Sequence, residues 1–137
     1  MRETGDDESV REFLRRRGAP DTVVARGLIG LIEAWERTAN AVETGYAFGL
    51  DDYLNDMDGR QLIADAWGAA SDLERRNVLD RLDDADERIR EHLSPRDSCL
   101  WGDGVAQYHG WERNKSWWYF TQPTHPGEQL LEELSGL

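Results

Sequence analysis

The sequence predicts a mainly α fold: a single-domain bundle of four or five helices, with an aromatic segment near the C-terminus that could contain a hairpin. Two observations support this prediction. The length of 137 residues suits one domain with one core. Apolar residues recur at helical spacing along most of the chain, but from Arg96 to Thr124 aromatic and turn residues replace this pattern.

The first predicted helix follows a short polar terminus. Residues 1–7 are expected to be disordered, and residues 8–137 are expected to form the single helical domain. Apolar residues at helical spacing predict a helix over Ser9–Arg17, which Gly18 and Pro20 should end.

The second predicted helix begins near Asp21, a residue type favoured at the N-cap position. Its apolar residues fall on one stripe when successive residues are turned by about 100°. These residues are Val24, Leu28, Leu31, Ile32, Trp35, Ala39, Val42 and Tyr46. Because this stripe is the most regular in the chain, we expect this helix, and Trp35 within it, to lie at the centre of the core.

The third predicted helix begins near Leu50 and changes its apolar phase part of the way along. The phase set by the residues from Leu50 to Met57 predicts an apolar residue near position 60, where the chain has Arg60. Because glycine permits backbone angles outside the helix, we expect a kink or a break at Asp58–Gly59.

A fourth helix is predicted to start with a capping box at Ser71–Glu74 and to end at Ser94–Pro95. The residues expected to point inward are Val78, Leu79, Leu82, Ala85, Ile89 and Leu93. The pairs placed for favourable i,i+4 contacts on its outer side are Asp72/Arg76, Asp84/Arg88 and Asp86/Arg90.

The aromatic segment is predicted to close one side of the bundle. Trp117–Phe120 is rich in residues that favour strands, and we expect it to pair with Cys99–Trp101 as a small hairpin. A short terminal helix is predicted over Pro126–Leu134, because proline is favoured in the first helical turn.

The balance of charge limits the classes of partner. The chain has 28 acidic and 16 basic residues, a formal net charge of -12, which should repel nucleic acids and anionic membranes and attract a basic protein. Cys99 is the one cysteine, which fits a reducing compartment, and the polar N-terminus does not resemble a signal peptide. We therefore expect a cytoplasmic protein with a basic protein partner. The sequence does not indicate the oligomeric state.

The candidate partner-binding surface lies at the start of the third helix. A helical wheel places five polar residues opposite the apolar stripe: Asp51, Asp52, Asn55, Asp56 and Asp58. A basic partner or a cation would relieve the repulsion among these carboxylates, although acids in a first turn also complement the helix dipole. On the fourth helix, Asp83, Asp84 and Glu87 could extend this surface. The alternative is that both clusters are ordinary solvated surface.

Trp117 and Trp118 form the second candidate surface. Neighbouring residues of a strand point to opposite faces, so burial of one tryptophan would leave the other more exposed and able to anchor a partner. The alternative is a wholly structural role for both.

The sequence predicts no catalytic residue, metal ligand or cofactor site. The three histidines are too far apart for a local metal motif, and Asp56–Gly59 matches only part of a calcium loop. Cys99 and His109 lack a recognisable nucleophile and base signature. Two competing hypotheses remain: a small-molecule- or divalent-metal-dependent enzyme that uses the Asp51–Asp58 cluster, and an adaptor with an aromatic interface.

Four segments together resemble a group of small, acidic, uncharacterised proteins of actinobacterial type: Leu50–Leu62, Trp101–Gly102, Trp117–Phe120 and Pro126–Leu134. This resemblance extends from Asp21 onward and implies no activity. In size and acidity the chain is also similar to immunity proteins that neutralise basic toxins. That similarity implies an inhibitor of the immunity or antitoxin type, whose acidic surface would occupy the active site of a basic toxin.

Overall fold

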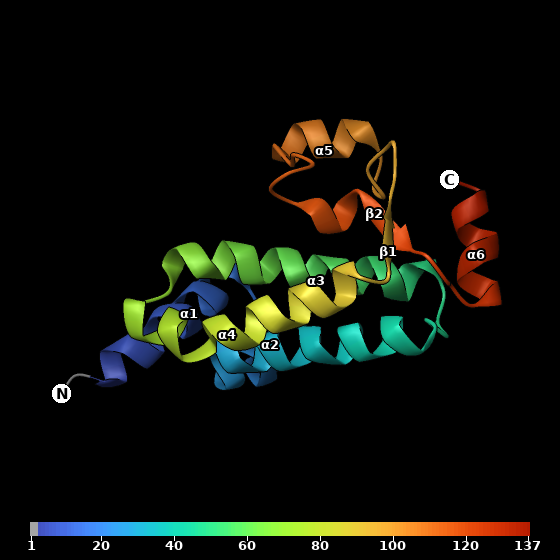
Figure 1. The fold of residues 1–137 in the computed structure, drawn as a ribbon. Coiled ribbons are helices and arrows are strands. Elements are labelled where there is room, and N and C mark those ends of the chain that lie inside the picture. The colour runs from blue at the N-terminus through green and yellow to red at the C-terminus, as the bar shows by residue number, and fades with distance from the viewer. Residues whose placement is uncertain (1–2) are drawn as a thin grey trace.

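The fold is that of a computed structural model of the chain (Figure 1). The structure describes residues 3–137, with side chains from Ser9 onward. Residues 3–7, which the sequence predicts to be disordered, belong to a helix that runs from Glu3 to Arg17, and residues 1 and 2 lie outside the described part. The rest of the chain forms one mainly helical domain, as the sequence predicts.

The described residues form six α-helices, one short 3-10 helix and two short strands. In chain order these are α1 (Glu3–Arg17), α2 (Asp21–Thr44), α3 (Leu50–Ala69), α4 (Asp72–Arg90), β1 (Leu93–Pro95), α5 (Asp103–His109), η1 (Trp117–Tyr119), β2 (Thr121–Pro123) and α6 (Glu128–Ser135). Helices α1 to α4 form the bundle, and the segment with α5 and η1 lies over α3 (Figure 1). None of the helices described is long and apolar enough to cross a membrane.

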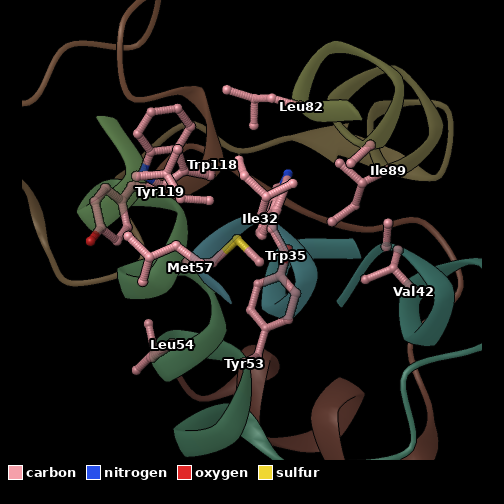
Figure 2. Packing of buried hydrophobic residues seen from close by; sticks show 14 of the residues in the cluster. Ile32, Trp35, Val42, Tyr53, Leu54, Met57, Leu82, Ile89, Trp118 and Tyr119 are labelled. Atoms are coloured by element: carbon pink, nitrogen blue, oxygen red, sulfur yellow. The ribbon is translucent and has the colours of Figure 1, made fainter. Parts of the chain in front are cut away.

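Helix α2 is the centre of the bundle, because α1, α3 and α4 all pack against it. Its predicted stripe is buried from Val24 to Val42. Trp35 is 2% exposed and lies among the buried side chains of Ile32 and Met57 (Figure 2). The prediction that Trp35 belongs to the core is therefore confirmed.

The irregular backbone lies in α2 and not in α3. Gly27 has φ 63° and ψ -151°, a conformation that glycine alone adopts readily, and it interrupts the helical geometry of α2. Helix α3 is continuous through Gly59, so the predicted break at Asp58–Gly59 is wrong. The change of phase has another cause: Arg60 is only 8% exposed and occupies the inward position where the pattern predicts an apolar residue.

Helix α4 begins with the predicted capping box. The Ser71 hydroxyl accepts a hydrogen bond from the Glu74 amide at 3.1 Å, and the Glu74 carboxylate accepts one from the Ser71 amide at 2.9 Å. Among the residues expected to point inward, Val78, Leu82, Ala85 and Ile89 are buried. The other two differ from the prediction, since Leu79 is 42% exposed and Leu93 lies in β1.

A hairpin is present near the C-terminus, but its strands differ from the predicted ones. Strands β1 and β2 pair antiparallel, with Ser94 opposite Gln122. Residues 117–119 form η1 instead of a strand. The reason is burial, because the consecutive residues Trp118, Tyr119 and Phe120 are all buried. Neighbouring side chains of a strand point to opposite faces, so a strand could not bury all three on one face.

Helix α5 was not indicated by the sequence, because only Ala106 of its seven residues is buried and no apolar stripe exists. The predicted terminal helix is present as α6, with Leu130 and Leu134 buried.

Candidate functional site

A charged pair joins α3 to α4. Arg60 Nε and Nη2 donate hydrogen bonds to the two carboxylate oxygens of Asp86, at 3.0 and 2.9 Å. Trp35 Nε1 donates to Asp86 Oδ1 at 2.8 Å. The side chains of Arg60 and Asp86 are 10% and 18% exposed, so this two-point pair is largely shielded from water. Asp86 thus bonds to α3, and not to Arg90, its predicted partner.

Two tryptophans of η1 stack on arginines, one of them Arg60 of this pair and the other its neighbour Arg90. The Arg60 guanidinium lies 4.3 Å from the ring centroid of Trp118, and the Arg90 guanidinium lies 4.6 Å from that of Trp117. Trp117 also contacts Trp35, with 6.3 Å between the ring centroids. Side chains from α2, α3, α4 and η1 therefore meet at one point.

A groove lies between α3 and α4, because both helices pack on α2 and make little direct contact with each other. Its volume is about 460 Å³. The apolar part of its wall comprises Ile63, Trp67, Leu79, Leu82, Trp117 and Trp118. The Arg60–Asp86 pair lies on its inner side, and Asp83, Arg90 and Lys115 also line it.

Two further hollows continue the groove along α4. One is shared with Asp83 and adds Glu87 and Glu91. The other continues from Trp67 and Leu79 toward the start of α4. The concave surface thus follows nearly the whole length of this helix.

The structure divides the predicted cluster on α3 into two groups. Asp51, Asp52 and Asn55 are exposed, as the helical wheel predicts. Asp56 and Asp58 are only partly exposed, because each accepts a hydrogen bond from another element of the fold. The expectation that these five residues face outward together is therefore wrong for Asp56 and Asp58.

Asp58 attaches the aromatic segment to α3. Its Oδ1 accepts hydrogen bonds from the Tyr119 hydroxyl at 2.6 Å and from Trp101 Nε1 at 3.0 Å. Burial raises the pKa of Tyr119 above its ordinary value, and the hydrogen bond to Asp58 raises it further. Asp58 thus has a structural contact that the helical wheel could not reveal.

Asp56 makes a similar contact on another side of α3. Its Oδ2 accepts a hydrogen bond from the Tyr46 hydroxyl at 2.5 Å. Burial raises the pKa of Asp56, nearby Asp52 adds to this effect, and the Tyr46 hydrogen bond opposes it. The pKa of Tyr46 is also raised, first by burial and then by the hydrogen bond to Asp56.

The three predicted acids of α4 are all exposed: Asp83, Asp84 and Glu87. Asp83 lines the groove and Glu87 lines the hollow beside it. Asp84 lies 4.0 Å from Arg88, which is one of the predicted i,i+4 pairs.

Most arginines near these surfaces make contacts within the protein. Arg81 pairs with Glu36 on α2 and Arg88 pairs with Glu43, both at 2.5 Å. At the start of α4, Arg75 pairs with Asp72 at 2.6 Å, where the sequence predicts Arg76. In the part of the chain with described side chains, no cation lies within ion-pair distance of the acids at 51, 52, 83 and 87.

Trp118 is 2% exposed and Trp117 is partly buried, and both line the groove. Trp118 Nε1 is buried and has no hydrogen-bond partner among the described residues. The sequence did not single out Trp67 and Leu79 as site residues. A signal existed for Leu79, because Val78 and Leu82 define the inward face and an adjacent leucine must then lie at its edge.

The other side chains with potential reactivity are dispersed or buried. Within residues 9–137, no group of three or more His, Cys, Asp or Glu side chains could hold a metal ion. Cys99 is 2% exposed, and burial raises the pKa of its thiol, which is the opposite of activation for nucleophilic attack.

Comparison with protein-family models, curated proteins and solved structures found no match to this chain. The resemblance to small acidic proteins of actinobacterial type and to immunity proteins therefore stays a prediction. Function has to be inferred from the groove and the charged surfaces beside it.

Proposed function

We propose that this protein binds a basic protein, as an inhibitor of the immunity or antitoxin type. The observation that supports this proposal best is the distribution of charge. The formal net charge is -12, while Arg60, Arg81 and Arg88 join the protein's own helices. Among the described side chains, exposed carboxylates that no cation approaches to ion-pair distance remain at the start of α3 and along α4. Such a surface attracts a basic partner and repels acidic ones.

The character of the exposed residues favours binding over catalysis. An inhibitor that occupies an active site needs a preformed surface of matching charge, and it needs no reactive group of its own. Here the acidic residues lie on helices that pack on α2, which holds them in a fixed arrangement. Cys99, by contrast, lies in the interior.

Capture by the immobilised protein from cells of its source, at low and at high ionic strength, tests this function. We expect retention of a basic protein at low salt and its release at high salt, because exposed charges are screened beyond about 10 Å at 0.1 M salt. Adding the acidic protein should then inhibit the activity of the captured protein. Capture of no basic protein, or capture that does not depend on salt, would contradict the proposal.

A further inference from the structure

We infer that the groove between α3 and α4 receives a basic amphipathic helix of the partner; this inference rests on the proposed function. Apolar side chains of that helix contact Trp67, Leu79 and Trp117. Its lysine or arginine side chains contact Asp83 and Glu87.

The groove presents apolar surface that the fold itself leaves uncovered. Leu79 is 42% exposed although it lies beside the buried Val78. Trp67 and Trp117 are partly exposed and line the same groove. Partly exposed tryptophan and leucine side chains gathered in a groove between two helices are the usual receptor for the apolar face of a third helix.

The shape of this surface fits a chain segment better than a small molecule. The three adjoining hollows are lined by residues of α4 and its end, from Asp72 to Glu91. At 1.5 Å per helical residue, this stretch is about 30 Å long. A partner helix of about five turns would match that length.

The acidic end of the groove, near Glu87 and Glu91, favours a basic occupant. Two of the cations that line the groove are ion-paired, because Arg60 bonds to Asp86 and Lys115 lies 3.3 Å from Glu112, and Arg90 stacks on the ring of Trp117. Arg76, which lines the hollow at the other end, leaves that end less acidic. The acids that remain without a described ion-pair partner are Asp83, Glu87 and Glu91. Cationic side chains on the rim of the docked helix would compensate them.

The Arg60–Asp86 pair sets the shape of the groove and does not meet the occupant's charges. Asp86 already accepts hydrogen bonds from Trp35 and from two nitrogens of Arg60. Because the pair joins one wall to the other, it fixes the spacing between α3 and α4. Arg60 and Asp86 are therefore positioning residues.

A labelled synthetic peptide of leucine and lysine, about 18 residues long with its leucines on one helical face, is the probe. Fluorescence anisotropy measures its binding to the full chain. One control peptide has the same composition in scrambled order, and another has glutamate in place of lysine. We expect the amphipathic basic peptide to bind about tenfold more tightly than the scrambled one. The acidic peptide should not bind.

Leu79→Ser tests the groove itself, and Leu131→Ser is its matched control. Both leucines lie on helices and are exposed, at 42% and 53%, but Leu131 belongs to α6 and lies outside the groove. We expect Leu79→Ser to weaken peptide binding about tenfold, because it removes apolar area buried in the complex. Leu131→Ser should bind as the parent does, and both variants should keep the parent's circular dichroism spectrum.

The outcomes separate this inference from the proposed function. If Leu79→Ser binds the peptide as tightly as the parent, while salt-sensitive capture of a basic protein persists, the groove is not the docking site and the proposed function stands. If no basic protein is captured, the proposed function fails as well. If sedimentation shows a dimer of the parent that Leu79→Ser dissociates, the groove is occupied by a second copy of the chain, which also overturns the inference.

Discussion

Arg60 accounts for the part of α3 that is hardest to interpret from the sequence. An arginine is rarely buried unless it is paired, so its position in the pattern suggests an interruption of the helix. Its partner, Asp86, lies 26 residues further along the chain and on another helix. Sequence periodicity contains no information on such a pairing, so the pattern predicts a kink at Gly59 where the structure has a buried charge.

Asp86→Asn should destabilise the protein by about 3 kcal/mol or more, because it leaves the buried Arg60 charge without a counter-ion. Asp83→Asn is the matched control, since the same chemical change then falls on an exposed residue of the same helix. That control should change the free energy of unfolding by no more than about 0.5 kcal/mol. Urea denaturation measures both, and equal effects would show that the pair does not stabilise the fold.

Three tyrosines should make stability fall in alkali. Burial raises the pKa of Tyr46, Tyr53 and Tyr119 in the folded protein, and hydrogen bonds to Asp56 and Asp58 add to the effect for Tyr46 and Tyr119. A group with a raised folded pKa contributes stability that is complete below its unfolded pKa and is lost as the pH rises above it. The free energy of unfolding should therefore fall above about pH 10, the ordinary pKa of tyrosine.

Urea titrations on either side of that pH, followed by circular dichroism, measure this loss. The free energy of unfolding of Tyr119→Phe should fall less steeply than that of the parent above about pH 10, because the variant lacks one of the three ionisable hydroxyls. Complete ionisation of these tyrosines while the protein remains folded would contradict the prediction.

At the scale of elements, local pattern was sufficient where each helix has its own apolar stripe. Helix α2 and the capped start of α4 could be predicted in this way. Helix α5 has no such stripe, with Ala106 as its one buried residue. The 3-10 helix η1 could not be predicted either, because its conformation depends on contacts with α3, which is far away in the sequence. The bond from Tyr119 to Asp58, 61 residues apart, is one such contact.

Two glycine variants test where the helical backbone is irregular. Gly27→Ala should destabilise by about 1–3 kcal/mol, because residue 27 has a positive φ that a side chain opposes. Gly59→Ala should stabilise by about 0.5–1 kcal/mol, because residue 59 lies inside α3. Its added methyl group would meet no atom within 4 Å. Thermal unfolding measures the stability of both variants. Stabilisation by Gly27→Ala together with destabilisation by Gly59→Ala would place the irregularity in α3.

At the scale of the whole molecule, sequence reasoning found the charges but not the groove. It correctly placed Asp51 and Asp52 on an exposed surface, as well as the acids of α4. The groove joins side chains as distant in sequence as Trp67 and Lys115. Only the packing of α3 and α4 on α2 brings such residues together, so no local pattern could predict it.

Two double variants, each lacking two negative charges, measure how the acidic surfaces contribute to association. Asp51→Asn with Asp52→Asn alters α3, and Asp83→Asn with Glu87→Gln alters α4. At low salt, both should slow association with the captured basic partner, because electrostatic attraction acts mainly on the association rate. The α4 variant should also dissociate faster, because its charges contact the partner directly. Stopped-flow kinetics at two salt concentrations measure these rates. If a variant associates and dissociates as the parent does, the surface that it alters is only solvated and does not bind the partner.

Docking against α4 is tested most directly by amide hydrogen exchange of the full chain, with and without the captured basic partner. Exchange should slow most in residues 79–91 and 114–118, which line the groove and its extension. The start of α3 should change less, because its acids attract the partner without lying in the groove. Slower exchange confined to the start of α3 or to α5, with residues 79–91 unchanged, would contradict docking in this groove.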